Sequence, residues 1–348
     1  MHATSLPEPS GAARARRATP LVSIVIAACN TERYIGRALQ SVLTQTERRI
    51  EVIVADDGSA DDTVSVVRGF DDRRITLLTS ARNHGQSHAR NRALQRARGE
   101  WIGILDSDDW YAPQRLARLL ETARAHEADL IADDLYMIQD GDERPWGTLF
   151  SQYGGRLNEA RVISAAEFVL SNLPGKRHLG LGSAKPLMRR GFLARHGLAY
   201  DETLRCGEDF ALYLACLVRG ARFIVTPQPY YFYRSRRDSV TSAHMHSNFE
   251  QLRQNNLALL PRELIRRDAQ LLAALTRRLA YIEQRIDYHR IMRPLKKRAF
   301  AAAVAEALRS PRLLSILVSY LPNVVRLRVR RRLKMFRNAL WRRFSRVA

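Results

Sequence analysis

Apolar residues in the first third of the chain follow two alternating patterns. Residues 21–28, LVSIVIAA, form a near-continuous apolar run rich in β-branched side chains, typical of a strand buried on both faces of a parallel sheet. Similar strands are predicted at 50–54, 75–79 and 101–105, and helical spacing predicts helices at 31–44, 61–70, 85–98 and from Pro113 to Ala125. This alternation predicts an α/β fold with a doubly wound, mostly parallel sheet.

The pattern changes in the second half of the chain. It predicts strands at 130–136 and 223–225, helices at 164–172 and 208–219, and a loop through residue 157. Beyond residue 247 only helical spacing remains. We therefore expect a disordered leader at 1–19 without an apolar signal-peptide region, an α/β domain at 20–247, and a helical C-terminal region at 248–348.

Charge is distributed very unevenly. The chain has 348 residues and a formal net charge of +22, and residues 251–348 hold 24 Lys and Arg against 5 Asp and Glu, which is +19 of that total. The predicted α/β domain is therefore nearly neutral. Its three cysteines form no C-x-x-C pair, which fits a reducing cytoplasm, and no apolar run reaches the roughly 18 to 20 residues of a membrane span.

Two acidic clusters follow predicted strands. Asp56 and Asp57 come after the second strand, and Asp106, Asp108 and Asp109 come after the fourth. Ligands of open α/β sheets bind at the carboxyl ends of the strands, so we expect both clusters at one edge of the sheet. Carboxylates this close together are tolerated mainly when a cation or hydrogen-bond donors lie between them. Mg²⁺ or Mn²⁺ bridged to a diphosphate is the expected partner.

Other acidic residues have a simpler interpretation. Asp61 and Asp62 are expected to be turn and cap residues. Glu208 and Asp209 open a predicted helix in the sequence G-E-D-F, where the helix dipole alone favours acids. They become candidates for catalysis because the two acidic clusters already indicate a transfer reaction that needs a base.

These residues together resemble glycosyltransferase family 2, whose members are inverting enzymes with the GT-A fold. The resemblance covers about residues 20–242. Five pieces occur in the expected order: V-S-I-V-I at 22–26 leading into Asn30, D-D-G-S at 56–59, A-R-N at 89–91 with D-S-D-D at 106–109, G-E-D at 207–209, and Tyr233 and Arg234 before S-V-T at 239–241. The sequence departs from the family pattern at Ala27 and Cys29, where proline and an aromatic residue are usual.

The resemblance assigns roles to individual positions. Asp57, with Asp56 beside it, would contact the nucleobase, and Arg90 would lie near the base and phosphates. Asp106 would lie by the ribose. Asp108 would hold the metal, and Arg234 would contact the diphosphate. Asp209 would be the general base, and Glu208 would lie in the substrate site. Proton transfer to Asp209 would accompany a single displacement that inverts the anomeric centre.

The last residues of the chain have an amphipathic pattern. Apolar residues from Val325 to Phe344 recur every three or four positions, with arginines largely between them. Such a cationic helix is typical of segments that lie on anionic bilayers. Packing on the α/β domain and a dimer contact are the alternatives. A nucleic-acid partner is not expected, because the segment has few aromatics and no recognisable nucleic-acid module.

The sequence therefore predicts a glycosyltransferase that uses a nucleotide-sugar donor, expected to be UDP-linked, and a carbohydrate acceptor. The resemblance to exopolysaccharide enzymes and the basic tail make a lipid-linked acceptor attractive, with the protein peripheral on the inner face of the cytoplasmic membrane. A sugar nucleotidyltransferase and a non-catalytic sugar- or membrane-binding module are the alternatives. His244 and His246 form an H-x-H pair that either binds metal or lies in a solvated loop.

Overall fold

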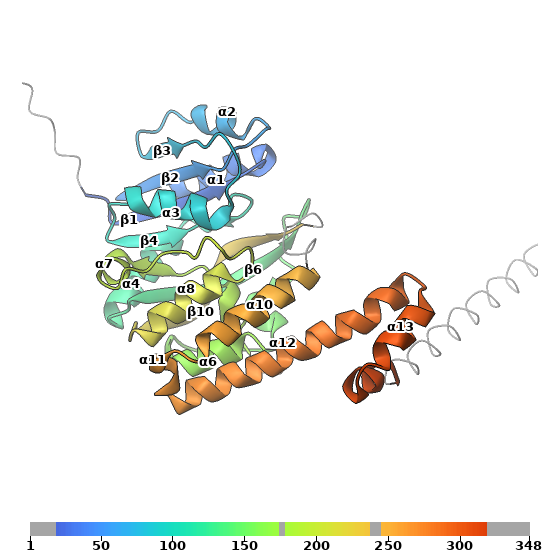
Figure 1. Ribbon diagram of the computed structural model, residues 1–348. Helices are drawn as coiled ribbons and strands as arrows, with labels where there is room; N and C mark the ends of the chain where they lie inside the picture. Colours follow the sequence, from blue (N-terminus) through green and yellow to red (C-terminus); the bar gives the residue numbers. More distant parts are fainter. Residues whose placement is uncertain (1–18, 174–177, 237–244, 319–348) are drawn as a thin grey trace, which may run out of the picture. The chain divides into compact units, whose positions relative to one another are not determined.

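The computed structural model describes residues 19–173, 178–236 and 245–318. The chain divides into two compact units (Figure 1). Unit 1 holds the residues up to Ser164 together with Gly175–Ser235, and unit 2 holds Ala165–Pro174 and the residues from Arg236 onward. Among the described helices, none combines the length and the hydropathy that a membrane span requires.

Unit 1 is built on one mixed sheet. Its main path runs in the order β3-β2-β1-β4-β9-β6-β10-β5, with β7 paired to β6 and β8 paired to β10. The strands are β1 Val22–Ala28, β2 Ile50–Asp56, β3 Ile75–Leu78, β4 Trp101–Ile104, β5 Trp110–Tyr111, β6 Leu130–Gln139, β7 Gly147–Thr148, β8 Arg161–Ile163, β9 Leu187–Arg189 and β10 Phe223–Ser235.

The first four strands are parallel to one another. β1 lies between β2 and β4 and pairs with both in parallel. Its apolar run is buried, and Val22, Ile24 and Ile26 have no exposed surface. Because these strands are parallel, the acidic residues that follow β2 and β4 lie at the same edge of the sheet. The predicted doubly wound, mostly parallel sheet is confirmed.

Helices connect and cover these strands. In unit 1 they are α1 Glu32–Leu43, α2 Thr63–Arg68, α3 Gln86–Arg96, α4 Arg115–Ala125, α5 Leu149–Gln152, α7 Arg190–Arg195 and α8 Glu208–Val218, with a 3-10 turn η1 at Leu181–Ser183. α3 packs on β1 and β2, as Figure 1 shows. Gly58, just after the first acidic pair, has a φ of +74°, and a Cβ there would lie 2.6 Å from the Arg82 carbonyl carbon. Only glycine fits this turn.

Three parts of unit 1 differ from the prediction. The expected loop before residue 157 is wrong, because β6 continues to Gln139 and is followed by β7 and α5. The strand predicted at 223–225 extends through β10 to Ser235, with register shifts around Pro229. Proline cannot donate a hydrogen bond to a strand partner, which is why the sequence did not predict this extension. Antiparallel β9, between β4 and β6, was also not predicted.

Unit 2 is helical in its described part. Its helices are α6 Ala165–Ser171, α10 Met245–Leu259, α11 Glu263–Arg266, α12 Ala269–Lys296 and α13 Phe300–Ala307. The long α12 begins at a cap in which the Asp268 side chain accepts a hydrogen bond of 2.9 Å from the Leu271 backbone N–H. α12 packs against the other four helices. Residues 1–18 of the predicted leader, His244, the His246 side chain and the predicted amphipathic helix at 325–344 lie outside the described residues.

Candidate active site

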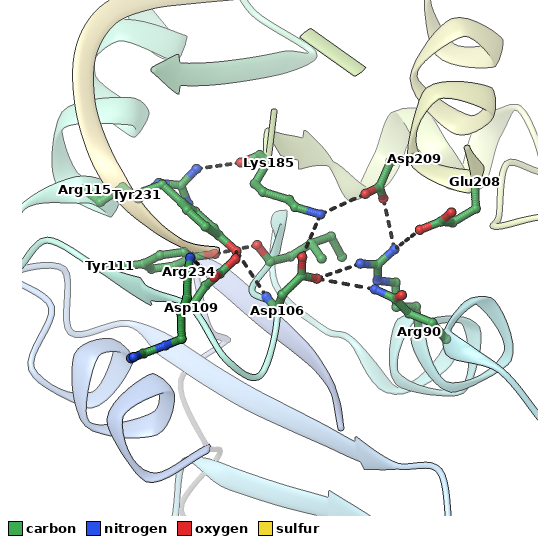
Figure 2. A network of polar contacts seen from close by, with 12 residues as sticks. Arg90, Asp106, Asp109, Tyr111, Arg115, Lys185, Glu208, Asp209, Tyr231 and Arg234 are labelled. Carbon is green, nitrogen blue, oxygen red and sulfur yellow. Dashed lines mark hydrogen bonds and ion pairs between the residues drawn. The ribbon is translucent and has the colours of Figure 1, made fainter. Parts of the chain in front are cut away.

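Two carboxylates and two cations form a closed ring of ion pairs at the carboxyl edge of β4 (Figure 2). Arg90 lies 2.7 Å from Oδ1 of Asp106 and 3.0 Å from Oδ1 of Asp209. Lys185 Nζ lies 2.9 Å from Oδ2 of Asp106 and 2.8 Å from Oδ2 of Asp209. Each carboxylate therefore uses one oxygen for each cation. We call Arg90, Asp106, Lys185 and Asp209 the charge ring.

Elements distant in the sequence supply the charge ring. Arg90 comes from the second turn of α3, Asp106 follows β4, and Lys185 immediately precedes the short segment that leads into β9. Asp209 lies in the first turn of α8, after Gly207, whose φ of +78° turns the chain into the helix. The fold therefore brings three separate segments around the residue that follows β4.

Burial makes the ion pairs of the ring strong. Arg90 has no exposed surface and Lys185 is 5% exposed. Burial alone would raise the pKa of Asp106, but Lys185 and Arg90 outweigh it and hold that pKa well below its usual range. Burial also opposes the charge of Lys185, yet Asp106 and Asp209 raise its pKa above the usual value. Arg90, Asp106 and Lys185 are therefore charged at neutral pH.

Glu208 is attached to one side of the ring. Its Oε1 accepts a hydrogen bond of 3.1 Å from Arg90. Burial and the neighbouring Asp209 charge raise the pKa of Glu208. With Glu208 included, three carboxylates share two cations, so the group holds one surplus negative charge when all members are ionised. Such a surplus favours binding of a proton or a cation.

Asp109 is held by the chain around it. Its Oδ2 accepts a hydrogen bond of 2.7 Å from the Tyr231 hydroxyl, and its Oδ1 accepts one of 2.8 Å from the Arg234 backbone N–H. Burial, followed by Asp108 and Asp106, raises the pKa of Asp109. This carboxylate therefore fastens the loop after β4 to β10.

Arg234, on β10, also contacts the loop after β4. Its Nε donates to the Asp108 carbonyl at 2.9 Å, and its Nη1 lies 3.1 Å from Oδ1 of Asp140. The guanidinium lies 4.9 Å from the centre of the Trp110 ring, and that of Arg37 lies 3.6 Å from the same centre. Two cations thus share one indole beside the loop after β4.

Asp56 and Asp57 form a second group at the end of β2. Asp56 accepts hydrogen bonds from the backbone N–H and the hydroxyl of Ser59. Asp57 accepts hydrogen bonds from the backbone N–H groups of His84 at 3.0 Å and Gly85 at 2.7 Å, just before α3. Both are buried. The structure places this pair and the charge ring at one edge of the sheet, through separate hydrogen-bond partners.

A divalent cation would depend on few protein ligands here. Within the described ranges, no group of three or more His, Cys, Asp or Glu side chains is arranged to hold a metal ion. Asp106 and Asp109 take part in the ion pairs and hydrogen bonds above, and Asp108 lies between them in the same loop, at the position that the family resemblance assigns to the metal. Mg²⁺ characteristically binds through one or two carboxylates and completes its shell with water and substrate phosphates. The residues present fit such a site.

Lys185 was not found by sequence reasoning. It stands alone in G-S-A-K-P, ahead of a three-residue strand with no clear periodicity. Sequence patterns also did not identify Arg115 and Tyr231, which support the site. Arg115 lies in an otherwise ordinary helix, and Tyr231 follows two prolines. The available signal was a lone basic residue next to a short apolar run, which is common in chains without any site.

The chain is similar to known proteins over most of its length. Residues 23–179 match the model of Glycosyl transferase family 2. The succinoglycan biosynthesis protein ExoO of Rhizobium meliloti (strain 1021) is 34% identical over 293 residues, covering 84% of this chain and 82% of ExoO. ExoU of the same organism is 34% identical over 301 residues, covering 85% of each protein.

Solved structures share the fold. Residues 1–349 of S. aureus TarS in complex with UDP-GlcNAc superpose with a TM-score of 0.59 at 19% identity, covering 87% of this chain and 92% of that one. The mannosyltransferase PcManGT from Pyrobaculum calidifontis, in complex with GDP-Man and Mn²⁺, gives a TM-score of 0.57 at 18% identity, covering 89% and 81%. The chain belongs to glycosyltransferase family 2 and is a glycosyltransferase with the GT-A fold.

Proposed function

We propose that this glycosyltransferase moves a sugar from a nucleoside-diphosphate donor, UDP-linked, onto a hydroxyl of a carbohydrate acceptor and inverts the anomeric centre. The observation that carries the proposal is the charge ring, in which the candidate base Asp209 is tied to Asp106 by two shared cations. A carboxylate held in a buried, fixed position can accept the proton of an attacking hydroxyl.

The base role of Asp209 is supported by the lone pairs it retains. Each of its oxygens accepts one hydrogen bond in the charge ring, and a carboxylate oxygen can accept two. One lone pair on each oxygen is therefore left to meet the acceptor hydroxyl. The surplus negative charge of the group, with Glu208 included, favours uptake of that proton.

The departing diphosphate needs positive charge. Arg234 is proposed to supply part of it, supported by its place beside the Asp108 carbonyl and by the second guanidinium, Arg37, on the same indole. Asp108 is proposed to hold Mg²⁺ or Mn²⁺, which would supply Lewis-acid stabilisation of charge on the leaving group. Cations in these places would stabilise the transition state more than the ground state.

The donor end is assigned to the residues after β2. Asp56 and Asp57 are proposed to form the nucleobase side of the site, and Arg90 and Asp106 to border the ribose and phosphates. Backbone N–H groups ahead of α3 already satisfy both oxygens of Asp57, which supports a fixed orientation toward a base. Arg90 holds Asp106, Glu208 and Asp209 together, so its proposed contact with the donor would be indirect.

The test is a screen of UDP-glucose, UDP-galactose, UDP-GlcNAc and GDP-mannose, with and without Mn²⁺, for release of nucleoside diphosphate. We expect release from a UDP-sugar that increases when a sugar acceptor is added. Formation of pyrophosphate, or of intact nucleotide sugar from sugar phosphate, would identify a nucleotidyltransferase instead. Donor binding without any turnover would identify a non-catalytic binding module.

The acceptor is proposed to be a growing chain of a surface polysaccharide or exopolysaccharide. This rests on the succinoglycan biosynthesis proteins that resemble most of the chain. A lipid-linked acceptor is proposed from a shorter likeness: the UDP-Glc:alpha-D-GlcNAc-diphosphoundecaprenol beta-1,3-glucosyltransferase WfaP of Escherichia coli is 34% identical over 34% of this chain. Comparing turnover on a free sugar and on the same sugar carried by a diphosphate lipid tests this part.

We further propose that the C-terminal region binds the anionic inner face of the cytoplasmic membrane. The described end of unit 2 supports this, because Val304, Leu308 and Val318 are 47%, 71% and 55% exposed. The exposed cations at 296–298 come directly before this apolar surface. Apolar exposure beside basic residues is typical of helices that lie on bilayers.

Removal of residues 326–348 tests the membrane proposal. We expect the shortened protein to lose flotation with anionic liposomes at low salt and to keep transfer to a soluble acceptor. Binding by the full chain should weaken as the Debye length shrinks from about 10 Å at 0.1 M salt to about 3 Å at 1 M. A lower melting temperature together with unchanged flotation would show that the tail packs on the protein instead.

A further inference from the structure

Lys185 is the member of the charge ring that no sequence motif identifies. Its ammonium donates to Asp209 at 2.8 Å and lies 2.9 Å from Asp106, and it is 5% exposed. Arg90, the other cation of the ring, also contacts Glu208, which is not a member of the ring. The Lys185 ammonium contacts the two carboxylates of the ring. Lys185 thus closes the ring on the side away from α3 (Figure 2).

The backbone of Lys185 is fixed independently of its side chain. The Lys185 carbonyl accepts a hydrogen bond of 2.5 Å from Nη2 of Arg115, and the same guanidinium lies 2.7 Å from Asp133. Both side chains of that second pair are fully buried. The ammonium therefore extends into the ring from a point that the core of unit 1 holds in place.

We propose that Lys185 is a positioning residue for the transfer reaction, which holds the second oxygen of Asp209 and links the orientation of this base to Asp106 at the donor side. The inference rests on the proposed function, because it takes Asp209 as the base. Arg90 alone would leave Asp209 free to rotate about the bond to its carboxyl group. Two cations on two oxygens fix the carboxylate plane, and reaction rates depend steeply on such orientation.

The ionic surroundings of Asp209 define what Lys185 contributes. The charged and titratable groups that face it are Arg90 from α3, Asp106 after β4, Lys185 before β9, Tyr200 ahead of α8, and Glu208 and Tyr213 from α8 itself. Only two of these groups are cations. Removing one of them leaves a buried set of carboxylates with a single positive charge, and a carboxylate that loses an adjacent cation binds protons more readily.

The same linkage gives Lys185 a second consequence for the reaction. A movement of Asp106 toward the donor would change the electrostatic interaction between its carboxylate and the Lys185 ammonium. Because that ammonium also contacts Asp209, the movement would alter the surroundings of Asp209 as well. Asp106 and Asp209 are therefore linked through Lys185 as well as through Arg90. Lys185 is the shorter of the two routes, because its single ammonium contacts both carboxylates.

The experiment compares Lys185→Met and Lys185→Arg with the unchanged protein, using UDP release from the UDP-sugar that it turns over best. We expect Lys185→Met to lower kcat by about 10²-fold, with donor affinity in a Mn²⁺ titration changed much less. The acidic limb of the pH profile of kcat should move to higher pH by about one unit. Lys185→Arg should recover part of kcat and return the limb toward its original position.

The matched control is Arg189→Met. Arg189 lies on β9, close to Lys185 in the sequence, but its guanidinium pairs with Glu100 at 2.9 Å and stacks on Trp101. This variant removes a cation four residues from Lys185 and leaves the charge ring intact. Its pH profile should match that of the unchanged protein. If Lys185→Met fails to fold, Lys185→Gln keeps a hydrogen-bond donor without the charge and takes its place.

The possible results separate the two proposals. A Lys185→Met variant with unchanged kcat, or with lower kcat and an unmoved acidic limb that Lys185→Arg does not recover, overturns the positioning role. Asp209→Asn is measured in parallel. If Asp209→Asn also retains turnover, the assigned base is wrong and the proposed mechanism fails with it. If only Asp209→Asn loses turnover, the mechanism stands and the role of Lys185 is rejected.

Discussion

Arg115 and Asp133 form an ion pair of 2.7 Å in which neither side chain has any exposed surface. Asp133 lies on β6 and Arg115 begins α4, so the pair fastens the helix to the sheet. Arg115 also donates to the Lys185 carbonyl. A buried ion pair in the core of unit 1 thereby fixes the position of the Lys185 backbone in the candidate active site.

Asp133→Asn should lower the free energy of unfolding by about 3 to 5 kcal/mol, because it leaves the buried Arg115 charge without its partner. Urea unfolding measures the change. Glu121→Gln is the matched control, since it breaks the 3.2 Å pair between Arg118 and Glu121, whose side chains are mostly exposed. Its effect should stay within about 0.5 kcal/mol. Equal effects of the two substitutions would mean that the buried pair contributes no more than a surface pair.

Asp209→Asn should lower turnover by about 10² to 10⁴-fold while donor affinity is largely kept, because the amide retains the shape and cannot take a proton. Steady-state UDP release and a separate donor titration measure the two quantities. Glu208→Gln provides the comparison, since Glu208 contacts the charge ring through Arg90 alone in the bonds described above. Its loss of turnover should be clearly smaller. The reverse order would make Glu208 the better candidate for the base.

Asp108→Ala should abolish the part of donor affinity that depends on Mn²⁺ and leave the melting temperature nearly unchanged. Asp108 is half-buried in the loop after β4 and lies outside the hydrophobic core of unit 1. Calorimetric titrations with UDP, with and without Mn²⁺, measure the effect. Asp71→Ala removes an exposed acid elsewhere and serves as the control for net charge. Full Mn²⁺-dependent affinity in Asp108→Ala would remove this residue from the metal site.

Protonation of Glu51 at low pH should lower the stability of the protein. Burial alone would raise its pKa, but hydrogen bonds from Ser23 and from the backbone and side chain of Arg98 outweigh burial and lower that pKa. A lowered folded-state pKa contributes stability above the unfolded value of about 4.3, and this stability is lost as the pH falls through the folded value. Glu51→Gln should therefore destabilise the protein at pH 7 and matter less near pH 3, as urea unfolding at both pH values would measure.

Sequence patterns predicted the first four strands of unit 1 well. Buried parallel strands are continuous apolar runs, and ligands bind at their carboxyl ends, so the positions of the runs were enough to place Asp56 and Asp106 at one edge of the sheet. Glu208 and Asp209 became candidates because the acidic clusters indicate a transfer reaction that needs a base, and the resemblance to the family singled out Asp209 for that role. The first turn of a helix favours acids for electrostatic reasons that have nothing to do with catalysis.

The other half of the site could not be predicted in this way, for a geometric reason. β9 runs antiparallel to its neighbours, so its beginning, not its end, lies at the carboxyl edge of the parallel strands. Lys185 therefore reaches the site by preceding a strand. Tyr231 and Arg234 reach it on β10, beyond prolines that ordinarily end a strand. Neither placement follows from local residue patterns.

The three-residue length of β9 has a mechanical consequence for the sheet. Its pairing with β4 spans Gly103↔Leu187 to Trp101↔Arg189, and its pairing with β6 joins two residue pairs. The backbone ladder that links the β1–β4 half to the β6–β10 half therefore rests on three residue pairs with β4 and two with β6, against seven between β1 and β2 and nine between β6 and β10. In-plane bending of the sheet should concentrate at this ladder, and amide hydrogen exchange should be faster in β9 than in β1. Since Lys185 lies at the end of this ladder, the stiffness of the sheet and the geometry of the proposed base Asp209 are set at one place.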